Sequence, residues 1–133
     1  MIYSELTRRY FENAAYAGAE TGADWFRGEA GSRERGTWVQ FDVKVPADAG
    51  GRIRCVRFLT FGCPHVIAVC QWVAEHAAGT AAAGRLPESA QALSARFEVP
   101  VEKLGRLLIV EDAWAAALGR AGAGRPRVLQ RNA

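Results

Sequence analysis

Apolar and polar residues alternate most regularly between residues 37 and 45, which read TWVQFDVKV. Alternation of this kind is typical of a β-strand, because successive side chains of a strand point to opposite faces of the sheet. Two further strands are predicted, a short one in DWFRGEA (residues 24–30) and another in RIRCVRFLTF (residues 52–61). The turn-forming sequences GSRERG and PADAGG connect the three, which predicts an antiparallel meander. The alternating positions of the central strand are Val39, Phe41, Val43 and Val45 against Trp38, Gln40, Asp42 and Lys44.

After Gly62 the spacing of apolar residues changes from two to about 3.6, which predicts helices in the second half of the chain. The first of these helices follows directly and ends near Gly79. The second has Pro87 in its first turn, and the third runs from about Glu102 to Leu118. The apolar positions that define them are Val66, Val69, Cys70, Val73, Ala77, Leu86, Ala90, Leu93, Phe97, Leu104, Leu107 and Leu108.

A further helix is predicted at the start of the chain, over residues 3–11, with Ser4 as its cap and Ile2, Leu6 and Tyr10 on one face. Strands followed by helices predict an α+β domain, in which helices pack on one face of a three-stranded antiparallel sheet. We expect residues 1–120 to form this domain. Residues 121–133 are rich in Gly, Pro and Arg, and we expect them to form a flexible basic tail.

Composition and charge limit the classes of function that the sequence predicts. The 133 residues carry a net charge of +3, but the arginines are scattered, so no nucleic-acid partner is predicted. The sequence has no apolar run of about 20 residues and no signal-peptide pattern at its start, so we expect a cytoplasmic protein without membrane attachment. Three cysteines without a CxxC pair do not indicate a disulfide framework.

Cys63 lies between Gly62 and Pro64, where the third strand gives way to a helix. A thiol at a helix N-terminus has a lowered pKa, and the thiolate is both the nucleophilic and the metal-binding form. His65 could assist it; alternatively, Cys63 is a small apolar residue in a tight corner. Cys70 lies about 10 Å farther along the helix, too far to share a metal ion with Cys63, so we expect it in the core.

The order and spacing of several motifs resemble the IscU/NifU N-terminal family of iron–sulfur cluster assembly scaffolds, from about Tyr3 to Leu118. YSE and FEN match the opening helix of the family, and RFLTFGC matches the strand before its middle cysteine. AEHAAG and EDAWAAAL are similar to two of its helices, and VP with Lys103 is similar to its chaperone-recognition segment. The resemblance implies the same three-stranded sheet with helices packed on it.

The resemblance also implies a degenerate cluster site. Cys63 matches the second of three cysteines that hold a [2Fe–2S] cluster in this family. The position of the first cysteine reads Arg35, followed by Gly36 and Thr37 instead of Gly and Asp. The His-Cys pair that follows the family's Lys is replaced by Gly105 and Arg106. Cys63 is then the one remaining candidate ligand for iron or a cluster, whereas such clusters need about four protein ligands.

The two arginines have three interpretations. They could supply the positive charge that a metal would bring, they could bind an anion or lower the pKa of Cys63, or each could pair with a carboxylate such as Glu34. A homodimer in which two Cys63 side chains, with His65 or a small thiol, share a cluster is a further alternative.

The leading hypothesis is a non-enzymatic, scaffold-like protein of iron–sulfur cluster assembly. The resemblance implies a cysteine desulfurase as a partner, which could pass a persulfide to Cys63. Val99, Pro100 and Lys103 mark the segment for an Hsp70-type chaperone, although Glu102 follows Val101 here. The alternatives are an adaptor or regulatory module that binds assembly partners without metal, and a thiol-dependent enzyme with Cys63 as nucleophile and His65 as base.

Overall fold

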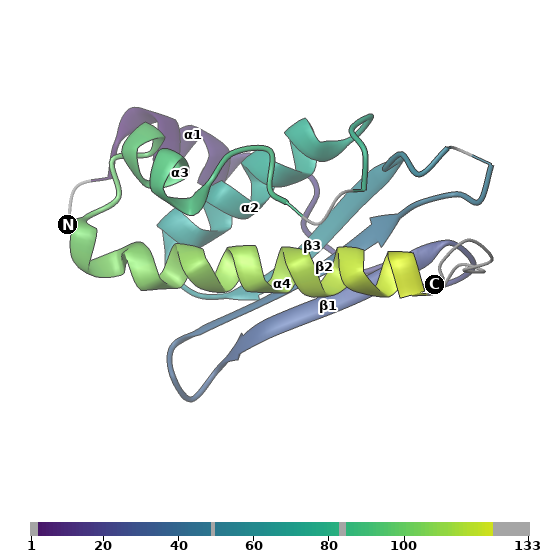
Figure 1. Ribbon diagram of the computed structural model, residues 1–133. Helices are drawn as coiled ribbons and strands as arrows, with labels where there is room; N and C mark the ends of the chain where they lie inside the picture. The colour runs from purple at the N-terminus through teal and green to yellow at the C-terminus, as the bar shows by residue number, and fades with distance from the viewer. Residues whose placement is uncertain (1–2, 49, 83–84, 124–133) are drawn as a thin grey trace.

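The computed structural model describes residues 3–48, 50–82 and 85–123, which form a sheet with helices on it (Figure 1). None of the helices in these ranges is long and apolar enough to cross a membrane. In chain order the elements are α1 (Glu5–Glu12), β1 (Trp25–Ser32), β2 (Thr37–Lys44), β3 (Cys55–Phe61), α2 (Pro64–Ala77), α3 (Ala90–Arg96), the 3-10 turn η1 (Val101–Lys103) and α4 (Leu104–Ala123).

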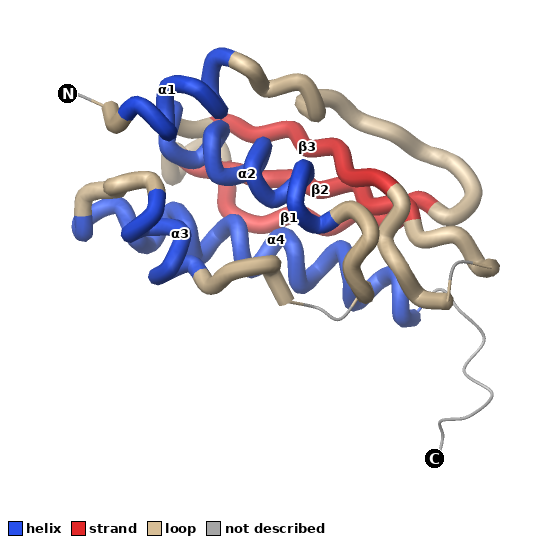
Figure 2. The backbone as a smooth tube through the Cα atoms, turned by 90° about the horizontal axis from the view of Figure 1, so that it is seen from above, coloured by secondary structure: helices blue, strands red, loops and turns tan. Residues whose placement is uncertain are grey.

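The three strands form one antiparallel sheet in the order β1-β2-β3, which confirms the predicted meander and the α+β class. Phe41 at the centre of β2 is paired with Gly28 on one side and Phe58 on the other. The helices lie over one face of the sheet, with α4 along β1 and β2 and α2 over β3 (Figure 2). Short turns between neighbouring strands make this topology the simplest one available to the chain.

The core lies between this face of the sheet and the helices. Phe41 is fully buried and contacts the indole of Trp114 edge-on, with ring centroids 5.1 Å apart. Helix α4 approaches β1 closely at Gly28, where a Cβ atom would lie 2.1 Å from the backbone nitrogen of Ala117. Cys70 is fully buried in this core, as predicted. A glycine at position 28 therefore sets how near the longest helix lies to the sheet.

Two polar positions of β2, Gln40 and Asp42, are also buried, in contrast to the exposed face that its alternation suggests. The segment after α1 forms a parallel bridge to β3 between Ala17 and Phe58 and then reaches β2. There the backbone N–H of Glu20 donates a hydrogen bond of 2.9 Å to the Asp42 carboxylate. Arg27 also binds Asp42, with 2.7 Å between its Nε and the carboxylate oxygen Oδ1. Asp42 is thus buried as an ion pair rather than exposed to solvent.

Three predicted helix boundaries are corrected. Helix α3 begins at Ala90, because the Ser89 hydroxyl caps it by accepting the N–H of Ala92; Pro87 lies before the helix and not in its first turn. Helix α4 begins at Leu104 after a 3-10 turn and continues to Ala123, five residues beyond the predicted end at Leu118. The expected tail is therefore helical through residue 123, and residues 124–133 lie outside the described part of the chain.

The remaining helix predictions agree better with the structure. Helix α1 is capped by Ser4, whose hydroxyl accepts the N–H of Thr7, as expected from its position before the helix. Leu6 and Tyr10 pack against the core, whereas Ile2 lies outside the described residues. Helix α2 begins at Pro64, as predicted. The packing of α1 and α2 against each other brings the start of the chain close to the start of α2.

Candidate functional site

Three segments that are distant in sequence lie toward one end of the molecule, on the left in Figure 1: the β1–β2 turn, the junction of β3 and α2, and the start of α4. The sheet register explains part of this arrangement, because Phe61 at the end of β3 pairs with Trp38 at the start of β2. Helix α4 reaches the same end because Gly31 packs against Ile109. The fold therefore positions the residues around Cys63 on rigid elements.

Cys63 is the N-cap residue of α2 and is half-buried. Burial raises the pKa of its thiol, but four nearby groups favour the thiolate, and the net result is a lowered pKa. These groups are the backbone N–H of Val66, the guanidinium of Arg106, the backbone N–H of His65 and the charge of Lys103. The Cys63 side chain does not form a regular cap hydrogen bond with either N–H group. These four groups therefore stabilise the thiolate form of Cys63 relative to the thiol.

His65 is only 1% exposed, and its ring contacts Tyr3 edge-on, with centroids 4.7 Å apart. Burial, followed by the charges of Lys103 and Arg106, lowers the pKa of this histidine. Its Nδ1 atom is buried without a hydrogen-bond partner. His65 acts on Cys63 through its backbone N–H rather than through its imidazole. The ring is accordingly a neutral, buried neighbour of the cationic side chains.

The ring of Tyr3 contacts both the ammonium of Lys103 and the ring of His65. The sequence analysis did not identify Tyr3 as a site residue. The ammonium of Lys103 lies 5.8 Å from the centre of the Tyr3 ring, a cation–π distance. The same ring covers His65. Its position in the YSE motif was the available signal, but no local pattern relates a residue at position 3 to one at position 65 or 103.

Arg106 and Arg35 are placed differently. Arg106 lies in the first turn of α4 and is half-buried, and its guanidinium is among the groups that lower the pKa of the Cys63 thiol. Arg35 is exposed in the β1–β2 turn, where its backbone N–H donates to the hydroxyl of Ser32 at 3.3 Å. The groups that shift the pKa of Cys63 include Arg106 and Lys103 but not Arg35. One of the two predicted arginines thus acts on the thiol.

The segment assigned to chaperone recognition lies beside the site. Val99 is buried at 8% exposure, and its backbone N–H donates to the carbonyl of Ser94 at 2.9 Å. Pro100 precedes the 3-10 turn, and its carbonyl accepts the N–H of Lys103. Val101, by contrast, is 81% exposed. The apolar side chain of this segment that is most available to a partner is therefore Val101, which was not among the predicted residues.

The residues around Cys63 do not fit a resident metal centre or cluster. The described part of the chain contains no group of three or more His, Cys, Asp and Glu side chains that could hold a metal ion. Cys70 is fully buried, which raises the pKa of its thiol, and Cys55 begins β3 opposite Lys44, at the other end of that strand from Phe61. A cluster carried by a scaffold is its cargo, but even cargo requires more ligands than one thiolate.

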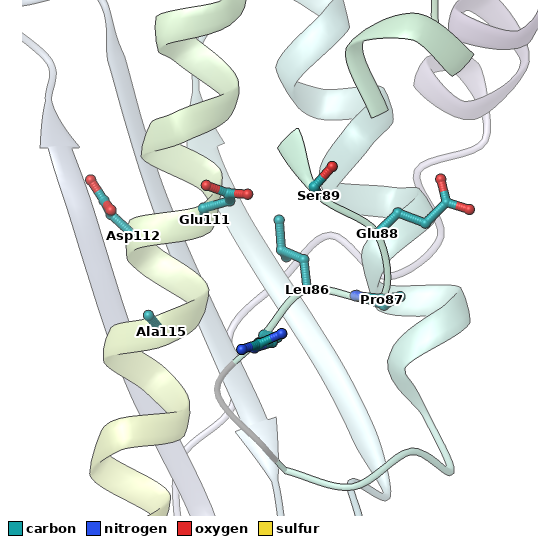
Figure 3. Close-up of a pocket in the computed structure, with 8 residues that line it drawn as sticks. Leu86, Pro87, Glu88, Ser89, Glu111, Asp112 and Ala115 are labelled. Atoms are coloured by element: carbon teal, nitrogen blue, oxygen red, sulfur yellow. The ribbon is translucent and has the colours of Figure 1, made fainter. Parts of the chain in front are cut away.

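A separate open pocket of about 500 Å³ lies between residues 85–89 and α4, away from the thiol (Figure 3). Glu111 points toward Ser89 in this view, and its carboxylate accepts the backbone N–H of Ala90 at 2.8 Å. The indole of Trp114 donates a hydrogen bond to the carbonyl of Arg85 at 2.7 Å. These contacts attach the loop to α4, so the polar groups of the pocket serve the fold.

Comparison with known proteins places the chain in a family. Residues 2–120 match the NifU-like N terminal domain family. A nitrogen-fixing NifU-like protein (N-terminal) from Brucella abortus superimposes with a TM-score of 0.70 at 17% identity, covering 92% of this chain and 95% of the other. A putative iron–sulfur cluster assembly scaffold protein for the SUF system from Fervidobacterium islandicum AW-1 gives 0.62 at 16% identity, covering 87% and 96%. No curated protein matches significantly. The fold and the match over residues 2–120 show that the chain belongs to the NifU-like N terminal domain family.

Proposed function

We propose that this protein is a non-enzymatic, scaffold-like component of iron–sulfur cluster assembly whose degenerate site retains Cys63 as the functional thiol. Membership of the NifU-like family and the likeness to a putative cluster assembly scaffold support the process. The observation that carries the role of Cys63 is its place as the N-cap residue of α2, where the N–H groups of Val66 and His65 and the guanidinium of Arg106 favour the thiolate. A structural cysteine in an apolar corner has no need of such a partner.

In this proposal Cys63 receives sulfur from a cysteine desulfurase. The Cys63 thiolate attacks the terminal sulfur of the persulfide on the desulfurase; a new S–S bond forms on Cys63, and the donor cysteine leaves as a thiolate. The arriving persulfide is itself an anion, and Arg106 and Lys103 provide the opposite charge beside it. The chemistry that makes the persulfide belongs to the desulfurase, so this chain needs no catalytic residues of its own.

Sulfur transfer can be measured directly. The purified chain is incubated with a cysteine desulfurase and ³⁵S-cysteine, and label on the chain is quantified after non-reducing electrophoresis. We expect label on the wild type and on Cys55→Ser, and its loss in Cys63→Ser. A chain that stays unlabelled while the desulfurase itself is labelled would refute the proposed sulfur acceptor. Label that persists in Cys63→Ser would do the same.

The alternative function, an adaptor that binds assembly partners without metal, is favoured by the surface near the thiol. Phe61 is 49% exposed two residues before Cys63, and Val101 and Leu108 expose 81% and 40% of their surface near the start of α4. Exposed apolar side chains of this size are common where a protein docks on another. If the adaptor function holds, Cys63→Ser retains binding to the desulfurase in a pull-down, whereas Phe61→Ser or Val101→Asp weakens it.

A further inference from the structure

The start of α4 places a permanent cation where the resemblance puts a cluster ligand. Arg106 stands at the position of the family's third cysteine, in the first turn of α4, and the neighbouring Leu107 is 1% exposed and anchors that turn in the core. From there its guanidinium favours the thiolate form of Cys63, together with the N–H groups at the start of α2. Arginine stays protonated in proteins and has no lone pair to offer a metal. The side chain at this position therefore acts on the thiol but cannot coordinate a metal.

We infer that Arg106 takes the place of the metal at this site: its guanidinium pairs with the Cys63 thiolate, and the site excludes iron and other thiophilic cations. This inference deepens the proposed function and rests on it for the role of Cys63. It makes the protein a member of its family that handles sulfur without holding iron.

Electrostatics at the site support this assignment. The two charged side chains that act on Cys63 are Arg106 and Lys103, and the same two act on His65. The thiol also sits at the N-terminus of a 14-residue helix, where the positive end of the helix dipole points at it. A divalent cation bound to Cys63 would face two like charges and this dipole. An anion on the sulfur would meet three favourable partners.

The other residues at the site do not supply the missing metal ligands. His65 is two residues from Cys63 and of a metal-binding type, but its Nδ1 atom is buried and its ring packs against Tyr3. Arg35, at the position of the family's first cysteine, is an exposed turn residue. One thiolate without further ligands falls short of the four that zinc and iron–sulfur sites usually have. The positive charge and the small number of ligands thus both disfavour metal binding at Cys63.

Cobalt(II) titration tests the inference, because thiolate ligation to Co²⁺ produces intense near-ultraviolet absorption. All proteins carry Cys55→Ser and are handled without oxygen. We expect the parent to show no more thiolate-to-cobalt absorption than Cys63→Ser. Arg35→Cys/Arg106→Cys, which returns thiols to two ligand positions, should bind Co²⁺ at least about 100-fold more tightly than the parent. Competition with a chromophoric chelator gives the same comparison for Zn²⁺.

Two variants separate charge from ligand number. Arg106→Ala removes the guanidinium without adding a donor and should bind Co²⁺ more weakly than Arg106→Cys, which replaces it by a thiol. Arg120→Cys is the matched control, because it adds a thiol to the far end of the same helix, at an exposed position. It should leave Co²⁺ binding as in the parent, and circular dichroism confirms that each variant is folded.

Two results would overturn the inference. One is Cys63-dependent metal uptake by the parent, including uptake by a dimer that shares two Cys63 side chains. The other is a folded Arg35→Cys/Arg106→Cys variant that binds no more Co²⁺ than Arg120→Cys. Neither result depends on sulfur transfer. Failure of ³⁵S labelling would contradict the proposed function. Metal uptake by the parent would contradict only the inference that the site is free of metal.

Discussion

Arg106 and Cys63 lie 43 positions apart in the sequence, on α4 and at the start of α2, and the guanidinium of Arg106 helps to lower the pKa of the Cys63 thiol. Burial alone would raise the pKa of this half-buried thiol. The N–H groups at the start of α2, the guanidinium of Arg106 and the charge of Lys103 lower it instead. Since the thiolate is the reactive form, a side chain on α4 contributes to the reactivity of a residue on another element.

Replacing Arg106 by glutamine tests this dependence. Glutamine removes the charge, so we expect the pKa of Cys63 to rise and a smaller fraction of the thiol to be ionised near neutral pH. Alkylation by iodoacetamide requires the thiolate; it should therefore be slower at pH 7, with its pH profile displaced to higher pH. Mass spectrometry of the Cys63 peptide over a pH series measures the profile.

The matched control is Arg35→Gln, which removes an exposed charge that does not act on the thiol. Its alkylation profile should coincide with that of the wild type. If Arg106→Gln and Arg35→Gln gave the same profile, the guanidinium contact with Cys63 would have no chemical consequence.

How much of the site could be predicted depends on how far apart in the sequence the contacting residues lie. Cys63 was identified from its own neighbours, because a glycine and a proline around a cysteine mark the strand-to-helix junction. The contact with Arg106 could be anticipated only through the family resemblance, which relates two distant segments. The cation–π contact of Lys103 with Tyr3 and the edge-on contact of Tyr3 with His65 join three more distant positions. Residue order contains no periodic signal for such contacts.

At the scale of elements, the contact between α4 and β1 depends on glycine. A Cβ atom at Gly28 would lie 2.1 Å from the backbone nitrogen of Ala117 and 2.6 Å from the carbonyl oxygen of Ala113. Because both are backbone atoms, no side-chain rotation could relieve the overlap, and α4 would have to move. We expect Gly28→Ala to lower the free energy of unfolding by about 1–3 kcal/mol, measured by urea denaturation.

Gly36→Ala is an unsuitable control for this experiment because its φ of +91° adds backbone strain. Gly105→Ala is better matched, since its Cβ atom would have open space around it in the same helix. A loss of stability in Gly28→Ala no larger than in Gly105→Ala would show that α4 does not lie so close to β1.

Helix α4 also illustrates where sequence patterns fail. The strand β2 and the helix α2 were predicted almost to their ends, because their apolar periodicities are strong. The end of α4 was predicted five residues early, because Gly119 and Gly122 look like helix stops. The apolar face nevertheless continues through Ala121, which is 2% exposed in the core. Tertiary packing overrides the local preference of glycine.

Gly119→Ala tests whether the helix extends beyond Leu118. Position 119 is exposed, and an added Cβ atom would meet no other atom. In a helix interior the replacement should raise the free energy of unfolding by about 0.5–1 kcal/mol, because alanine loses less backbone entropy than glycine. Thermal unfolding followed by circular dichroism detects such a gain, and an unchanged or lower stability would place the end of the helix before residue 119.

At the scale of the whole molecule, the helices and the segment after α1 cover the sheet. The helices cover one face, and the segment after α1 bridges to β3 and reaches β2, where Glu20 binds Asp42. Asp42 is 1% exposed and joins this segment to Arg27 on β1 through β2. A single carboxylate therefore connects three parts of the chain, and its burial is tolerated because its oxygens are paired.

Removal of this carboxylate should loosen the covering segment and not only lower the overall stability. In Asp42→Ala the guanidinium of Arg27 and the N–H of Glu20 lose their acceptor, so we expect a loss of about 1–3 kcal/mol in the free energy of unfolding. Arg27 is 40% exposed and regains water, which keeps the loss moderate. Hydrogen exchange should accelerate first at Glu20 and its neighbours, while α2 stays protected. If exchange instead rose uniformly through the fold, Asp42 would contribute to global stability without specifically anchoring this segment.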